Sequence, residues 1–171
     1  TLTGATRFRQ EEAQLRAAPI IANLLERLGQ MKGATGLPRA REVLRFTNPL
    51  SESFGESRMK WIALALGLPE PVAQKLVTVD GQDYYLDLWI KELKTGFEFD
   101  GLLKYDTTTS QGRDAFIREK RRDDHLMSAG LLLHHFMGED VATLDAGRVA
   151  FTRALGQDAL QRLTPRRHLL G

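Results

Sequence analysis

The chain has 171 residues, of which 42% are hydrophobic and 27% are charged, a composition typical of a globular protein with a buried core. It contains no cysteine, which excludes a disulfide framework and a thiolate zinc site. No stretch approaches the roughly 20 apolar residues that a membrane helix requires, and no secretory signal opens the chain. We therefore expect a cytoplasmic protein without a membrane partner.

The charge is more informative in its distribution than in its sum. A net charge of +2 is too small to indicate a polyanionic partner. Basic residues nevertheless cluster at 39–45, 118–122 and 166–168, and each cluster could neutralise phosphates. Ordinary solvated helix faces are the alternative interpretation of each cluster.

The first fifty residues have a helical pattern. Apolar residues recur at helical spacing over 7–31, where Pro19 predicts a break or kink into two helices. Pro38 opens a second short helix that ends near Phe46. Residues 1–50 are therefore predicted to be a helical extension or the end of an upstream domain.

Residues 51–171 form the second predicted unit. Ser53 or Ser51 can cap a helix that Gly67 ends, and Asp80-Gly81 is a hairpin signal between two strands. The predicted elements are a helix over 53–67, strands over 72–79, 84–90 and 94–99, a helix over 114–129, a strand over 131–136 and a helix over 140–155. This order predicts an α/β fold, a mixed four-stranded sheet flanked by helices with an N-terminal helical extension.

Two neighbouring strands of this sheet carry carboxylates among apolar residues. Asp87 lies within Tyr-Leu-Asp-Leu-Trp, and Glu98 alternates with Phe97 and Phe99. Adjacent strands can place Asp87 and Glu98 side by side, with Asp100 on the same face. Two such carboxylates repel each other unless a cation separates them, and Mg²⁺ or Mn²⁺ held by carboxylates is typical of phosphoryl chemistry.

A structural interpretation of these carboxylates is also open. Asp87 could point to water from an edge strand, and Glu98 could pair with Lys94 or Lys104. His134 and His135 lie on opposite faces of the last strand, which favours a core histidine and a partly exposed one over a metal site. Gln74 begins the first strand, and we predict a surface position for it. A hydrogen bond from its side chain near the acidic site is the alternative.

Five short motifs occur in a characteristic order over residues 51–137. They are Ser-Phe-Gly-Glu-Ser-Arg at 53–58, Gly-Leu-Pro at 67–69, Asp-Leu-Trp at 87–89, Glu-Phe-Asp-Gly with Lys-Tyr at 98–105, and Glu-Lys-Arg-Arg-Asp at 119–123. In this order they resemble the PD-(D/E)xK nuclease superfamily, whose restriction-endonuclease-like fold includes very-short-patch repair enzymes. The nearest resemblance is to actinobacterial proteins in which such a domain often follows an antitoxin-like winged-helix segment.

The resemblance implies a restriction-endonuclease-like fold and a DNA endonuclease or nickase that depends on Mg²⁺ or Mn²⁺, with a defence role by analogy. Asp87 would ligate the metal, Glu98 would be the acidic residue of the second half-motif, and Glu56 would complete the site from the first core helix. Asp100 is a further candidate metal ligand. An upstream winged-helix domain is a possible partner, and the oligomeric state is not determined by the sequence.

The lysine that the superfamily places two residues after Glu98 is replaced by Asp100. Lys104 is the preferred substitute, because it follows the strand that bears Glu98. Lys120 is the other candidate, since its helical spacing puts it on one stripe with Phe116, Asp123 and Met127, which we expect to face the core instead of solvent. The alternative function is a catalytically inactive, nuclease-fold module that binds DNA or regulates a partner.

Four arginines are candidates for contacting nucleic acid. Arg58 belongs to the first motif, and Arg118, Arg121 and Arg122 belong to the basic helix over 114–129. Guanidinium groups bind phosphate through paired N–H donors, so a helix bearing several of them is typical of a phosphate-contacting surface.

Overall fold

The computed structural model describes residues 10–101 and 109–169. The elements in chain order are α1 (Gln10–Gln30), α2 (Leu37–Phe46), α3 (Phe54–Ala65), β1 (Val72–Val79), β2 (Gln82–Ile90), η1 (Lys91–Leu93), β3 (Thr95–Asp100), α4 (Ser110–Ser128), β4 (Leu132–Met137), η2 (Glu139–Val141), α5 (Leu144–Leu155), α6 (Gln157–Gln161) and η3 (Arg167–Leu169). The predicted order of helix, three strands, helix, strand and helix is confirmed.

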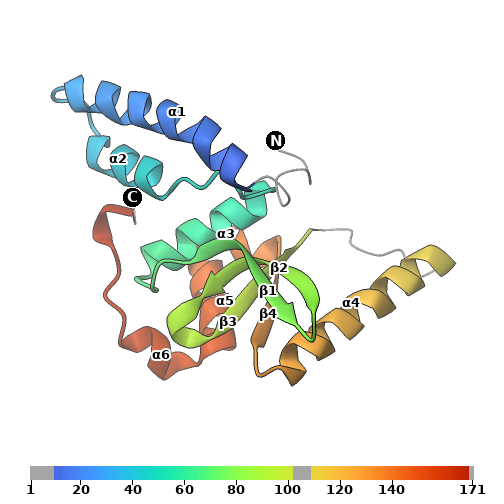
Figure 1. The fold of residues 1–171 in the computed structure, drawn as a ribbon. Helices are drawn as coiled ribbons and strands as arrows, with labels where there is room; N and C mark the ends of the chain where they lie inside the picture. Colours follow the sequence, from blue (N-terminus) through green and yellow to red (C-terminus); the bar gives the residue numbers. More distant parts are fainter. Residues whose placement is uncertain (1–9, 102–108, 170–171) are drawn as a thin grey trace.

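The four strands form one mixed sheet in the order β1-β2-β3-β4 (Figure 1). The β1–β2 and β2–β3 pairs are antiparallel, and the β3–β4 pair is parallel. The parallel pair requires a crossover connection, which contains α4. The predicted α/β class, the mixed four-stranded sheet, its flanking helices and the N-terminal helices are all present.

Helices cover both faces of this sheet. Phe97 on β3 packs in the main hydrophobic cluster with Ile62 of α3 and Phe151 of α5. Its neighbour Glu98 bonds Arg122 of α4. Adjacent strand residues point to opposite faces, so α4 lies on the face opposite α3 and α5. Figure 1 shows the N-terminal part of α4 extending away from the sheet.

The N-terminal helices differ from the sequence prediction at Pro19. We expected a break or kink into two helices there, but α1 is one helix of 21 residues with Pro19 inside it. A proline removes one hydrogen bond from the helix, and the long flanks on both sides continue the helical pattern. α2 packs along α1, and the Arg41 guanidinium donates to the backbone carbonyl of Leu28 at 2.9 Å. Ala13 of α1 reaches the main hydrophobic cluster.

Several helix ends were predicted a few residues away from their position. α4 begins at Ser110 because the Thr109 side chain accepts a hydrogen bond from the Gly112 amide at 3.1 Å. α5 begins at Leu144 after the short η2 turn, and Thr143 caps it in the same way. Ser53 is confirmed as the cap of α3. The short helices α6 and η3 were not predicted, since segments of five and three residues carry little periodicity.

Gly147 controls how closely α5 approaches α3. A Cβ atom at this position would lie 2.5 Å from Cγ2 of Ile62, a side chain that is fully buried. We expect Gly147→Ala to lower the free energy of unfolding by roughly 1–3 kcal/mol through overpacking. Gly29→Ala is the matched control, because a Cβ on this exposed helical glycine meets nothing within 4 Å. The control should be neutral or stabilising by up to about 1 kcal/mol, and equal denaturation midpoints for the two variants would contradict the prediction.

Candidate functional site

The three carboxylates expected from the sequence are all buried. Glu56, Asp87 and Glu98 are 7%, 6% and 6% exposed, on α3, β2 and β3. Glu56 is fixed at the start of α3: its amide donates to the Ser53 side chain at 3.1 Å, and its Oε2 accepts from the Glu52 amide at 2.8 Å. Capping thus orients this glutamate before any tertiary contact forms.

Gln74 on β1 joins two of these carboxylates. Its Nε2 lies 3.3 Å from Oε2 of Glu56 and 3.1 Å from Oδ1 of Asp87. The two carboxylates are therefore separated by a single amide nitrogen. Gln74 is 2% exposed, so the surface position preferred from the sequence is wrong.

The backbone explains why Gln74 turns inward. Its φ is 50°, in the left-handed region that residues other than glycine rarely adopt. The β1–β2 pairing runs through Ala73↔Leu88 and Lys75↔Leu86, and the intervening Gln74 and Asp87 are not paired. This irregularity cannot be read from the alternation of apolar and polar residues, which assumes a regular strand.

Asp87 lies where β2 changes its packing partners. Leu88 belongs to the main cluster with α3 and α5, whereas Leu86 packs with Leu126 of α4 in a second cluster. Residues two apart in a regular strand share a face, so the strand is distorted around Asp87. Oδ2 of Asp87 accepts a hydrogen bond from the Phe99 amide at 2.9 Å, which brings the aspartate next to Glu98.

Glu98 is paired with an arginine from α4. Arg122 Nη2 lies 2.7 Å from Oε1 of Glu98 and also donates to the Tyr85 carbonyl at 2.8 Å. This partner is not Lys94, one of the two lysines that the structural interpretation offered, and the other, Lys104, lies outside the described residues. Burial raises the pKa of Glu98 to about 7, and the nearby charge of Asp87 adds to this, although Arg122 opposes it. Burial and the charge of Asp87 also raise the pKa of Glu56.

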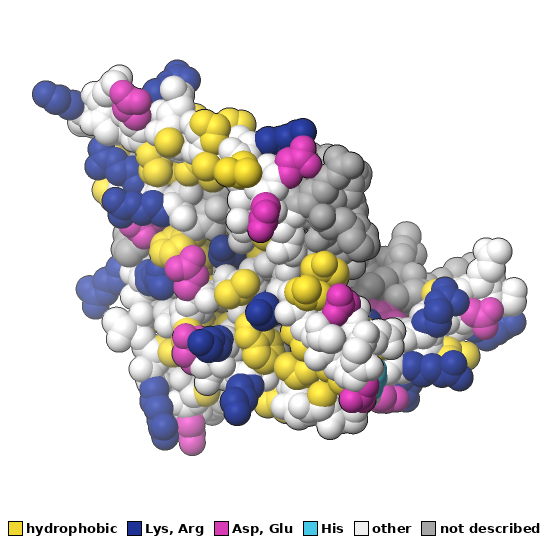
Figure 2. Space-filling model, viewed as in Figure 1, with side chains coloured by type: hydrophobic (Ala, Val, Ile, Leu, Met, Phe, Trp, Pro, Cys, Tyr) yellow, Lys and Arg dark blue, Asp and Glu magenta, His cyan; other side chains and the backbone are white. Residues whose placement is uncertain are grey.

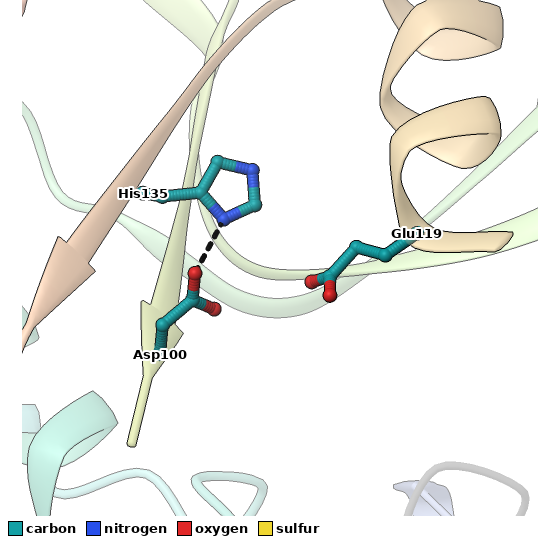
Figure 3. Close-up of side chains that lie close together, drawn as sticks. All are labelled: Asp100, Glu119 and His135. Carbon is teal, nitrogen blue, oxygen red and sulfur yellow. Dashed lines mark hydrogen bonds and ion pairs between the residues drawn. The ribbon is translucent and has the colours of Figure 1, made fainter. Parts of the chain in front are cut away.

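A second group of titratable side chains lies beside Glu98. The ring of His135 on β4 bonds Asp100 through Nδ1 and Asp123 through Nε2, both at 2.9 Å. Glu119 of α4 faces the same ring, and one ligand atom from each of Asp100, Glu119 and His135 lies within 4.8 Å of the others (Figure 3). The hydrogen bonds that the ring donates to Asp100 and Asp123 raise the pKa of His135 to about 10, so the ring is an imidazolium at neutral pH.

The position of His135 next to the carboxylates was not predicted from the sequence. The two histidines do face opposite sides, because His134 stacks on the core residue Phe97 with ring centroids 5.6 Å apart. The parallel register pairs His135 with Glu98, which brings the imidazolium beside the carboxylates. Only the pairing of β4 with β3 shows this, and the sequence does not specify which strand β4 joins.

Asp100 does not join Asp87 and Glu98 in one ligand group. Within residues 10–101 and 109–169, the acidic group compact enough to hold a metal contains Asp100 but neither Asp87 nor Glu98. The carboxylate of Asp100 bonds His135 instead. The expected three-residue metal set is thus divided between two adjacent groups, with Arg122 bound to Glu98 of one and to Asp123 beside the other.

The two lysine candidates are placed differently. Lys104 lies outside the described residues. Lys120 is exposed, as are Phe116 and Met127, so the interpretation of these three as a stripe facing the core is wrong. The helix turns Arg122 and Leu126 inward instead. Lys120 does line an open pocket, whose other lining residues are Asp100, Phe116, Glu119, Asp123, His135 and Met137.

The arginines expected to contact nucleic acid also separate into two kinds. Arg58 donates to the carbonyls of Val141 and Ala142, so its guanidinium holds α3 to the η2 segment. Arg122 is committed to Glu98. Arg118 and Arg121 are exposed on α4, where Figure 2 shows basic side chains on the projecting helix.

Comparisons of the chain with protein-family models, curated proteins and solved structures found no match. None of the helices in the described part of the chain is both long and apolar enough to cross a membrane.

The Arg122–Glu98 ion pair gives a first test of the site. We expect Arg122→Ala to reduce the free energy of unfolding by roughly 2–4 kcal/mol, because it leaves Glu98 buried without its cationic partner. Arg118→Ala, an exposed change on the same helix, should shift it by less than about 0.5 kcal/mol. Chemical denaturation measures both, and similar midpoints for the two variants would show that the pair does not stabilise the fold.

The proton on His135 gives a second test. The pKa is about 10 in the folded protein and 6.5 in an ordinary histidine. The protonated ring therefore makes its full contribution to the free energy of unfolding below about pH 6.5, and this contribution disappears as the pH rises to 10. Between pH 7 and 10 the wild type should lose roughly 2 kcal/mol or more relative to His135→Gln. Denaturation at several pH values measures this difference, and parallel pH profiles would rule out the raised pKa.

Proposed function

We propose that this chain is a divalent-metal-dependent phosphodiester hydrolase that acts on DNA. The observation that carries the proposal is the burial of Glu56, Asp87 and Glu98 on three neighbouring elements, with Asp87 close enough to affect the charge of both glutamates. Arg122 forms its ion pair with Glu98, while Glu56 and Asp87 share the neutral amide of Gln74. Buried carboxylates that lie close to one another repel, and a divalent cation between them would relieve this repulsion.

The donor atoms fit Mg²⁺ or Mn²⁺. Carboxylate and amide oxygens are hard ligands, and the three acidic residues and Gln74 offer no sulfur or neutral imidazole that would favour a softer metal. Burial, and after it the charge of Asp87, raises the pKa of both Glu56 and Glu98, and a bound cation would oppose both effects. When bound, such a cation lowers the pKa of a water molecule and neutralises charge on a phosphate.

Two cationic side chains stand beside the carboxylates and take the role that the superfamily gives to its lysine. Arg122 bonds Glu98, and His135 is an imidazolium on the next strand. Both are fixed by carboxylate or carbonyl partners, so their positive charges are oriented before a substrate binds. Lys120 could supply a further charge from the rim of the adjoining pocket.

We assign the domain to the PD-(D/E)xK superfamily on the same grounds. The mixed sheet places an aspartate and a glutamate on two adjacent central strands, with a helix glutamate beside the aspartate. DNA is the proposed substrate because a phosphodiester suits this site, and because exposed Arg118, Lys120 and Arg121 lie on the helix next to it.

Cleavage of supercoiled plasmid with Mg²⁺ or Mn²⁺ tests the function. We expect the wild type to nick or cut the plasmid, and Asp87→Asn and Glu98→Gln each to reduce the rate at least about 100-fold, because each removes a charged metal ligand of similar shape. Gln82→Met, at an exposed position on β2, is the control that should keep full activity. Wild-type activity that survives in both amide variants would place the chemistry elsewhere.

The alternative is a nuclease-fold module that binds DNA without cutting it. The observation in its favour is Asp100, which occupies the position of the superfamily's lysine and is engaged with His135. It predicts DNA binding that weakens steeply with salt, and no cleavage with either metal. An inert wild type that still binds plasmid would replace the hydrolase proposal with this one.

A further inference from the structure

One oxygen in the site has no partner although it is buried. Within the part of the chain that the structure describes, Gln74 Oε1 is an acceptor without a hydrogen bond, on a side chain that is 2% exposed. The other end of the same amide contacts Glu56 and Asp87. The amide therefore stands among the carboxylates with one of its two polar atoms unsatisfied, which is uncommon for a buried group.

The backbone at Gln74 is held in an unfavourable conformation. Its φ of 50° lies in the left-handed region, and the residue interrupts the β1–β2 ladder opposite Asp87. The Gln10 side chain at the start of α1 donates a hydrogen bond to the backbone carbonyl of Gln74 at 2.8 Å. Strained residues that the surroundings hold in place occur preferentially where a side chain must reach a ligand.

We infer that Gln74 is a direct ligand of the divalent cation, through Oε1, together with Glu56 and Asp87. The inference rests on the proposed cation site and adds a neutral ligand that none of the sequence motifs contains. Without a cation, Nε2 faces the two carboxylates and bridges them. With a cation, rotation of the amide by half a turn exchanges Nε2 for Oε1, so Oε1 faces the cation together with the two carboxylates and Nε2 takes the place that Oε1 leaves.

This exchange explains why a glutamine occupies the position. A hard divalent cation accepts amide oxygens as well as carboxylates. A third carboxylate at this point would repel Glu56 and Asp87 when the cation is absent, and an apolar side chain would offer no ligand at any time. The amide can satisfy the carboxylates in one orientation and the cation in the other.

Calorimetric titration of the full chain with MnCl₂ tests the inference. Gln74→Met keeps the length and removes both polar atoms, and it should weaken Mn²⁺ binding at least tenfold. The control Gln82→Met makes the same exchange at an exposed position and should bind Mn²⁺ like the wild type. Equal Mn²⁺ affinity of Gln74→Met and the wild type would overturn the inference, as would a wild type that binds no Mn²⁺.

Gln74→Glu gives an independent result, because it predicts opposite effects with and without the cation. In EDTA its thermal midpoint should fall below that of the wild type, since a further negative charge faces Glu56 and Asp87. Added MnCl₂ should raise the midpoint more than it does in the wild type, as expected for an added anionic ligand. A Mn²⁺-induced rise smaller than that of the wild type would refute a ligand role for this position.

Plasmid cleavage separates this inference from the proposed hydrolysis. Mn²⁺ binding that depends on Gln74, in a wild type that cuts no DNA, keeps the ligand assignment and removes the hydrolase. Mn²⁺-dependent cutting in a protein whose Mn²⁺ affinity is unaffected by Gln74→Met keeps the hydrolase and overturns the ligand assignment.

Discussion

The crowding of acidic side chains around β2 and β3 is the constraint to which the rest of the site responds. Glu56, Asp87 and Glu98 are buried, and Asp100 lies two residues after Glu98 on β3. Carboxylates removed from water must be neutralised, hydrogen-bonded or protonated. Each response is present: Arg122 pairs with Glu98, the Phe99 amide bonds Asp87, and the pKa of Glu98 is raised to about 7.

The fold supplies these partners from both faces of the sheet. Glu56 comes from α3, whereas Arg122 comes from α4 on the opposite face. The distortion of the β1–β2 pair at Gln74 allows groups from the two sides to meet at Asp87. Because Gln10 bonds the carbonyl of Gln74, the first helix is connected to this distorted position as well. Gln74 therefore connects α1 to the carboxylates of Glu56 and Asp87 through hydrogen bonds of its backbone and its side chain.

Two cationic side chains each bridge two acidic residues. Arg122 stays charged at every relevant pH, while His135 keeps its proton because it donates hydrogen bonds to Asp100 and Asp123. His135 of β4 thus places a cation beside Asp100 of the neighbouring strand β3.

The sequence by itself determined the α/β class, the order of the core elements, a serine cap at position 51 or 53 and the location of Asp87 and Glu98 on neighbouring strands. Each of these depends on local periodicity or on a residue's immediate neighbours. Only the tertiary structure decided that Gln74 turns inward, that Arg122 binds Glu98 and that His135 stands beside them. These depend on a strand distortion, on the rotation of α4 about its axis and on the register of β4, and none of the three leaves a periodic signal in the chain. Lys120 was wrongly predicted to face the core, and Asp100 was wrongly grouped with Asp87, for the same reason. Spacing along one element does not specify which of its faces meets the other elements.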